Sequence, residues 1–294
     1  MKIDSACILE DRGILFVEGP DAKDFLQNII TNDIEKVTEN SSCFASLLSP
    51  QGKFLFDFII IKHKKGYLID CEKGQIDELY KKLSLYKLGS ELKILNLSNE
   101  FVVVAFTDEK FLSINNSRDE LGYTLKFGED PILLDPRNKK LGARLIINLE
   151  KLNSTLKKLN LKSSNQEEYY KLSFELGIVQ KNTDKLKDKI FGIECNFEEL
   201  NGIDFHKGCY VGQENTARIK LRNKLIKRLF PIKVIEGKIN EGDIIFSENS
   251  EVGKVLISEN YPFAIIKYTS EKFNFNSILN IKEAKIKVIK PSWL

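Results

Sequence analysis

The residues best suited to chemistry lie in one short stretch, which reads Lys-Gly-Cys-Tyr-Val-Gly-Gln-Glu from Lys207 to Glu214. A cysteine reacts or binds metal as the thiolate, and its pKa falls beside a cation or a helix N-terminus. Lys207 supplies a cation next to Cys209, and the residues from Gln213 to Lys220 predict a helix just after it. The stretch predicts an activated thiol, with a small apolar cysteine packed behind the loop as an equally good alternative.

A second candidate is Asp57, an acid within the apolar run from Phe54 to Ile61. Period two in this run puts apolar side chains on both faces, which predicts a strand that is covered on both sides. An ionised carboxylate is costly to bury alone, so Asp57 is predicted to be hydrogen-bonded, protonated or at a ligand cavity. An acid satisfied by a neighbouring loop is the alternative interpretation.

The elements that must position these residues follow from hydrophobic periodicity. Residues 22–30 carry apolar side chains at i, i+3, i+4, i+7 and i+8, which predicts a helix that ends at Thr31-Asn32-Asp33. Further helices are predicted at 75–88 and 166–176, with Gly177 as the C-terminal cap of the latter. Strands are predicted at 14–17, 91–97, 101–106 and 132–134, with another after Gly142.

The C-terminal part has a different character. Short strands at 230–235, 243–246, 253–257, 263–268 and 281–288, separated by glycine and proline turns, predict a small antiparallel barrel, whose end Trp293 is expected to cover. A chain of 294 residues exceeds what one core usually organises. We therefore predict one domain at 1–225, which can divide into lobes 1–97 and 98–225, and a barrel domain at 226–294.

Composition narrows the function classes. A net charge of +3 from 45 basic and 42 acidic residues gives no general attraction to nucleic acid. The basic run from Arg218 to Arg228 contains no aromatic residue to stack bases and is interpreted as a solvated face, either an edge strand or a frayed helix. The five cysteines form no CxxC or Cys/His cluster, so no metal site is predicted. Without a signal-like start or an apolar run of membrane length, a cytoplasmic protein is expected.

The cysteine loop, which continues as Asn215-Thr216-Ala217-Arg218, closely resembles the signature of the YgfZ-type folate-binding proteins. These proteins are relatives of the glycine-cleavage aminomethyltransferases and act in iron-sulfur cluster assembly. The stretch from Ser49 to Asp57 and the Asp-Pro-Arg at 135–137 resemble the same family. The resemblance implies an α+β protein with an aminomethyltransferase-like folate-binding body, of one or two lobes, and a small C-terminal antiparallel β-barrel.

The resemblance also implies roles for two acids. In the aminomethyltransferases the second member of a doubled aspartate is catalytic and faces the folate; Asp57 matches it, and Phe56 replaces the first member. Glu175 matches a glutamate that grips the pterin through two parallel donors, although Ser173 stands where the relatives usually have arginine. A solvent-facing acid is the alternative for Glu175.

Other residues are implied as folate contacts. Asn32 matches a segment that borders the folate pocket, although ending a helix is an equally good reason for it. Arg137 and Arg144 could pair with an anion such as a glutamyl tail, or lie on a solvated face. The cysteine loop is expected to add Tyr210, Gln213 and Glu214.

By this resemblance the protein would be a tetrahydrofolate-binding accessory factor for assembly or repair of iron-sulfur clusters, indirectly supporting tRNA modification and more a non-enzymatic factor than an enzyme. Cys209 would be the reactive thiolate, its pKa lowered by Lys207, and the partners would be the assembly machinery or client enzymes. One thiolate cannot hold a cluster, so partner chains or small thiols would complete it. The alternative is a folate-dependent one-carbon transferase using Asp57 as acid or base, which the cysteine loop disfavours. A plain RNA-binding module at 218–228 is a third.

Overall fold

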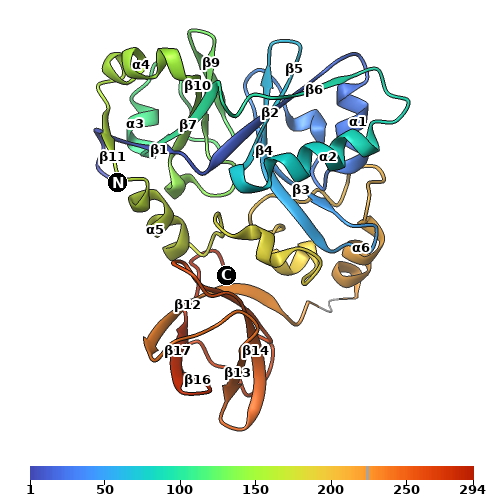
Figure 1. The fold of residues 1–294 in the computed structure, drawn as a ribbon, viewed down its shortest axis with the longest axis vertical. Helices are drawn as coiled ribbons and strands as arrows, with labels where there is room; N and C mark the ends of the chain where they lie inside the picture. The colour runs from blue at the N-terminus through green and yellow to red at the C-terminus, as the bar shows by residue number, and fades with distance from the viewer. Residues whose placement is uncertain (223–224) are drawn as a thin grey trace. The chain divides into compact units, whose positions relative to one another are not determined.

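The computed structural model describes residues 1–222 and 225–294 (Figure 1). The chain alternates between two compact units. The first comprises Met1–Leu48, Phe56–Tyr169 and Leu200–Val211, and the second comprises Ser49–Leu55, Tyr170–Glu199 and Gly212–Leu294. The domain boundary predicted at residue 225 stays a prediction. No helix in the described ranges has the length and apolar character needed to cross a membrane.

One sheet of the first unit has five strands in the order β3-β4-β5-β2-β6. Its central strands are rich in β-branched and aromatic residues, which suit a pleated surface covered on both sides. In β4 only Lys62 of the ten residues is not buried, which confirms the two-sided strand predicted around Asp57. The strands are β2 (Arg12–Glu18), β3 (Cys43–Leu48), β4 (Phe54–His63), β5 (Gly66–Glu72) and β6 (Lys93–Asn96).

Two helices accompany this sheet in the chain. The predicted first helix is confirmed as α1 (Ala22–Ile29), which buries the stripe Ala22, Phe25, Leu26 and Ile29. It ends where Ile30 turns to an extended conformation, directly before the Thr-Asn-Asp sequence. The helix predicted at 75–88 is confirmed as the shorter α2 (Ile76–Tyr86), because the chain leaves the helix before the turn at Gly89.

The other sheet of the first unit has six strands in the order β11-β1-β7-β10-β9-β8. Its core contains Val104, Phe106, Leu134 and Leu145. The short helices α3 (Asp108–Leu112) and α4 (Leu152–Lys158) belong to this part of the chain. The strands are β1 (Ser5–Leu9), β7 (Phe101–Phe106), β8 (Thr124–Phe127), β9 (Asp130–Leu134), β10 (Ala143–Asn148) and β11 (Lys162–Ser164).

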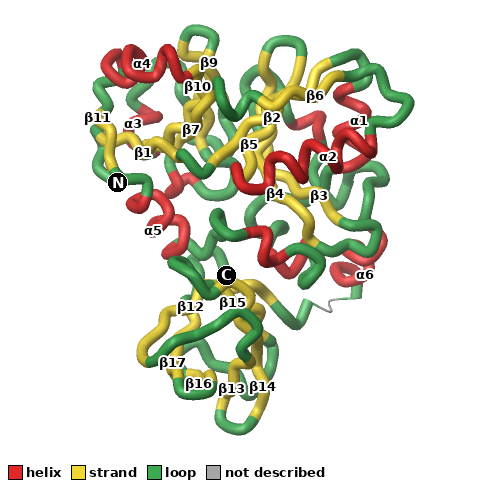
Figure 2. Tube along the Cα trace, viewed as in Figure 1, coloured by secondary structure: helices red, strands yellow, loops and turns green. Residues whose placement is uncertain are grey.

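The second unit contains the predicted barrel, which is confirmed as a closed one with the strand order β12-β15-β14-β13-β16-β17 (Figure 2). Its interior is filled by apolar side chains such as Phe230, Val255 and Ile286. The single strand predicted at 281–288 is instead a hairpin, because Lys282 has a positive φ. The strands are β12 (Arg228–Glu236), β13 (Ile244–Ser247), β14 (Ser250–Ile257), β15 (Phe263–Ile266), β16 (Leu279–Ile281) and β17 (Ala284–Val288).

Two α-helices lie in the chain between β11 and the barrel. The first is α5 (Glu167–Glu175), which runs into the second unit and ends before Gly177, a residue with φ of +73° as expected for a cap. The indole N–H of Trp293 donates to the carbonyl of Leu176 at 2.9 Å, so this side chain is bound near the end of α5. The helix predicted after the cysteine loop is confirmed as α6 (Gln213–Leu221).

Candidate functional site

Cys209 is an exposed thiol, whereas the other four cysteines, all of them described, are buried. Burial raises the pKa of Cys43 to about 12 and also raises the pKa of Cys71, because an apolar interior disfavours the thiolate. The alternative of a cysteine packed in the interior is therefore wrong for Cys209. Among the cysteines, its sulfur is the one that a partner or a reagent can reach.

Lys207 fixes the loop that carries this thiol. Its Nζ donates to the carbonyl oxygens of Gln27 at 2.6 Å, Ile30 at 2.7 Å and Asn32 at 2.8 Å. These carbonyls lie at the C-terminal end of α1, where a cation complements the helix dipole and satisfies carbonyls that have no partner within the helix. The ammonium also lies 5.1 Å from the centre of the Tyr210 ring. Lys207 thus joins the loop to the end of α1.

The charge of Lys207 is held in an interior environment. Burial lowers the pKa of Lys207 to about 8, and the charges of Asp33 and Asp204 act in the opposite direction. Three carbonyl acceptors require N–H donors, so the protonated amine is the form that fits this place. Sequence reasoning assigned Lys207 the task of activating Cys209, which stays a prediction. The structure shows a second task, anchoring the loop.

Backbone and side-chain hydrogen bonds tie the same loop to the last turn of α1 and to the residues that follow this helix. The hydroxyl of Thr31 donates to the carbonyl of Gly202 at 2.6 Å, and the N–H of Asp204 donates to the carbonyl of Thr31 at 3.0 Å. The N–H of Val211 donates to the carbonyl of Asn28 at 3.2 Å. The exposed thiol therefore sits on a loop fastened on both sides of the cysteine.

Asn32 completes this attachment. Its amide nitrogen donates to the carbonyls of Phe44 and Asn201, both at 2.7 Å, and its amide oxygen accepts from the N–H of Asp33 at 2.9 Å and from Lys36 Nζ at 3.1 Å. The side chain is buried, and all of its donors and acceptors are occupied. Asn32 does more than end a helix; its contact with folate stays a prediction.

Asp57 lies on β4 and is only 8% exposed. Burial raises the pKa of this carboxyl to about 6, while the positive charges of Arg12 and Arg137 limit the rise and Glu72 adds to it. In the described part of the chain no ion pair joins the Asp57 carboxylate to a basic group within 4 Å. Such a group can accept or donate a proton near neutral pH, as general acids and bases do.

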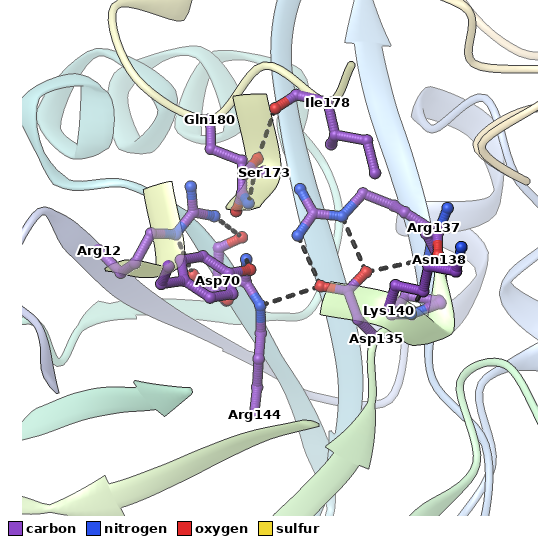
Figure 3. A network of polar contacts seen from close by, with 12 residues as sticks. Arg12, Asp70, Asp135, Arg137, Asn138, Lys140, Arg144, Ser173, Ile178 and Gln180 are labelled. Atoms are coloured by element: carbon purple, nitrogen blue, oxygen red, sulfur yellow. Dashed lines mark hydrogen bonds and ion pairs between the residues drawn. The ribbon is translucent and has the colours of Figure 1, made fainter. Parts of the chain in front are cut away.

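A chain of buried ion pairs lies in the first unit (Figure 3). Arg12 Nε contacts Asp70 Oδ1 at 2.6 Å, and Arg144 Nη1 contacts the other oxygen of Asp70. Arg144 Nε also contacts Asp135 Oδ2 at 3.2 Å. Arg137 binds Asp135 through both its Nε at 2.9 Å and its Nη2 at 2.7 Å. The cluster joins β2 and β5 of one sheet to β10 of the other.

The cluster contains three guanidinium groups and two carboxylates, so it carries an excess positive charge. Arg12 and Arg137 are the two members whose charges limit the pKa rise of Asp57. Arg137 and Arg144 are 3% and 1% exposed, so the solvated face considered for them is wrong. Arg144 also donates to the hydroxyl of Tyr169 at 2.6 Å, and its pairing with a ligand anion stays a prediction.

Sequence reasoning missed Arg12 and Asp70. Asp70 follows the apolar residues Tyr67, Leu68 and Ile69, which is the same signal that identified Asp57. The arginines together hold the pKa of Asp70 below its usual range despite complete burial. An acid within an apolar strand would have been enough to find it.

The remaining predicted contacts are distributed over both units. Tyr210 is buried in the first unit. The second unit contains half-buried Gln213 and exposed Glu214 in the first turn of α6, and it contains Glu175, which is exposed at the end of α5. Their contacts with folate stay predictions. Among the described residues, no group of three or more His, Cys, Asp and Glu side chains could hold a metal ion.

The basic run is not the uniform solvated face that was predicted. Arg218 and Lys220 lie on α6, which excludes the edge-strand alternative for them. Arg228 is 7% exposed, because its guanidinium pairs with Glu199 at 2.5 Å and donates to Asn196 Oδ1 at 3.1 Å. Lys224 lies outside the described residues.

No protein-family model matches the chain. It is 30% identical over 252 residues to a Dictyostelium discoideum protein named iron-sulfur cluster assembly factor IBA57 homolog, mitochondrial, covering 76% of the chain and 61% of that protein. A Neurospora crassa protein of the same name is 30% identical over 237 residues, and 52% of it is covered. The mouse IBA57 assembly factor is 27% identical over 250 residues, and 66% of it is covered. The chain thus spans between half and two thirds of these relatives.

A solved structure has the same fold. It is the glycine cleavage system aminomethyltransferase T from Bartonella henselae, with a TM-score of 0.76, 13% identity, and coverage of 99% of this chain and 86% of that one. The predicted aminomethyltransferase-like α+β fold with a C-terminal barrel is thereby confirmed. The predicted cytoplasmic location is wrong, because the three assembly-factor relatives are named as mitochondrial proteins.

Proposed function

We propose that the chain serves as an accessory factor in iron-sulfur cluster assembly, because it is homologous to the IBA57 iron-sulfur cluster assembly factors of the YgfZ family. The observation that carries this proposal is the exposed sulfur of Cys209 on a loop fastened by Lys207 and Asn32. An accessible thiol on a rigid support can meet a partner in one defined geometry. Support for tRNA modification would follow indirectly, through the cluster enzymes served.

The thiol would act transiently. Clusters usually take four protein ligands, and none of the other four cysteines, all of which the structure describes, is exposed. The remaining ligands would come from the assembly machinery, from a client enzyme or from small thiols. Cys209 would therefore contact the cluster or its sulfur during transfer, and the protein would not keep the cluster.

We also propose tetrahydrofolate as the ligand of the body. The support is the aminomethyltransferase-like fold together with Asp57, a buried carboxyl with no ion pair in the described part of the chain and a pKa raised to about 6. The pterin ring carries N–H donors, and a carboxylate is the acceptor that suits them. Asp57 fits such a ligand; Asn32, Arg144 and Tyr210, which lie in the same unit, are its further proposed contacts.

The alternative is a folate-dependent one-carbon transferase. The observation that favours it is the same carboxyl, because a pKa of about 6 suits proton transfer near neutral pH. The accessible Cys209 speaks against it, since a transferase of this kind needs no such thiol. Both functions require folate binding, but only the assembly role requires Cys209.

A calorimetric titration of tetrahydrofolate tests these proposals. We expect Asp57→Asn to bind roughly 10-fold more weakly, as expected when a charged hydrogen-bond acceptor is lost. Cys209→Ala and its neighbour control His206→Ala should bind as the parent does. Absence of binding by the parent would overturn the folate proposal and leave the assembly role standing. Turnover of a one-carbon donor that survives in Cys209→Ala would favour the transferase.

A further inference from the structure

The second unit has a cavity of about 400 Å³ whose lining is rich in lysine. It is bounded by the turn before β4, by residues 189–194 and by the barrel strands β14 and β15. Apolar side chains of Ile190, Leu256 and Ile265 form part of the lining. Five lysines also line it, namely Lys53, Lys189, Lys227, Lys254 and Lys267.

Two of these lysines are neutralised within the unit. Lys267 pairs with Glu251 at 3.1 Å, and Glu251 itself lines the cavity. Lys189 pairs with Glu241. Exposed pairs of this kind are weak and are easily exchanged for a ligand, but they cancel charge while they last.

The other three lysines have no such partner. In the described part of the chain, Lys53, Lys227 and Lys254 form no ion pair. Lys53 Nζ lies 3.7 Å from the centre of the Phe191 ring. The remaining acid of the lining is Glu194, whose Oε2 accepts from the N–H of Phe191 at 2.8 Å. Three ammonium groups against one carboxylate leave an excess of two positive charges.

We propose that this cavity binds a small phosphorylated molecule that carries two or more phosphate groups. Lysine binds phosphate as a point charge, and three of them from separate segments can surround a phosphate chain. The cavity volume lies in the range of small-molecule sites, roughly 300–1,000 Å³. A flat protein-binding surface has no such cavity. The apolar lining suits the uncharged part of such a molecule.

The proposal also gives a use to part of the basic run. Lys227 belongs to the basic run from Arg218 to Arg228, in which Arg228 is engaged with Glu199 and Lys220 with Glu198. Lys227 instead lines the cavity, as does Lys53 from the turn before β4. Lys53 and Lys227, which lie far apart in the sequence, thus both supply positive charge to the cavity.

Calorimetric titration with inorganic tripolyphosphate, ADP and adenosine tests the proposal on the full chain. We expect the two phosphorylated probes to bind and adenosine to bind at least 10-fold more weakly. Lys53→Gln and Lys254→Gln should each weaken binding of ADP roughly 10-fold, since each removes one charged hydrogen-bond donor. The matched control is Lys287→Gln, an exposed barrel lysine outside the cavity, which should bind as the parent does.

A second measurement locates the site. Acetylation of lysines followed by peptide mass spectrometry should show Lys53 and Lys254 protected by tripolyphosphate, with Lys287 modified equally in its presence and absence. The proposal is overturned if neither phosphorylated probe binds at millimolar concentration, or if the cavity variants bind as tightly as the control. Protection by hexaglutamate but not by tripolyphosphate would also overturn it, by assigning the lysines to an acidic peptide.

Discussion

Replacing Lys207 by methionine removes the anchor of the cysteine loop while keeping most of the side-chain volume. The ammonium donates to three carbonyls at the end of α1, at 2.6, 2.7 and 2.8 Å. Methionine fills the space but donates to none of them. The carbonyls of Gln27, Ile30 and Asn32 would then lose the partner they have in the parent.

The expected loss of stability follows from two opposing contributions. Three hydrogen bonds from a charged donor, at about 1.5 kcal/mol or more each, stabilise the fold by roughly 5 kcal/mol. Burying the ammonium costs about 3 kcal/mol, because the pKa of Lys207 falls from 10.5 to about 8. The difference predicts that Lys207→Met lowers the free energy of unfolding by roughly 2 kcal/mol.

Urea unfolding at pH 7 measures this loss. The control is Lys23→Met on α1, whose ammonium pairs with Glu35 at the surface and whose removal should leave the urea midpoint close to that of the parent. Labelling of Cys209 by a thiol reagent should become less uniform in Lys207→Met, as the loop loosens. A Lys207→Met protein as stable as the parent would refute the anchoring role, since it would mean that the three bonds contribute nothing.

Two further predictions concern the buried charges. The pKa of Asp57 is raised from 3.8, its ordinary value, to about 6 in the folded protein. Between these two pH values the folded protein keeps a proton that the unfolded chain has released, so the parent loses stability as pH rises through this window. In urea unfolding, the free energy of unfolding of Asp57→Asn should therefore exceed that of the parent by up to about 3 kcal/mol at pH 7.5 and equal it near pH 4. An equal gain at both pH values would show that the Asp57 carboxyl does not titrate in this window. Asp70→Asn leaves Arg12 and Arg144 without their shared carboxylate and should cost roughly 3–5 kcal/mol by thermal unfolding, against less than about 0.5 kcal/mol for the exposed Asp4→Asn; a small effect at position 70 would show that the cluster relaxes.

The periodic parts of the fold could be predicted from the sequence. The stripe from Ala22 to Ile29, the two-sided run after Phe54 and the short strands after Leu229 each encode their own element in adjacent residues. In these places the local hydrophobic pattern agrees with the burial in the folded chain, so tertiary contacts did not change the type of element that the pattern predicts. The exceptions were boundaries, such as the hairpin between Leu279 and Val288, where one residue with a positive φ divides a run.

The electrostatic part of the site could not be predicted in the same way. Arg12 and Arg144 reach Asp70 across 58 and 74 residues, and Lys207 reaches the end of α1 across 175 to 180 residues. No local period encodes such pairs, because the fold alone brings the residues together. Exposure of Cys209 was likewise undecided by spacing, since a loop cysteine can face either side.

The most direct test of the assembly role measures cluster content in cells whose own gene is deleted and replaced by the parent, Cys209→Ala, Cys209→Ser or the loop control His206→Ala. A [4Fe–4S] client enzyme is purified from each strain, and its iron and sulfide are determined per protein. We expect full occupancy with the parent and with His206→Ala, and strongly reduced occupancy with both Cys209 variants at equal protein level. Client enzymes fully loaded in the Cys209→Ala strain would contradict this expectation.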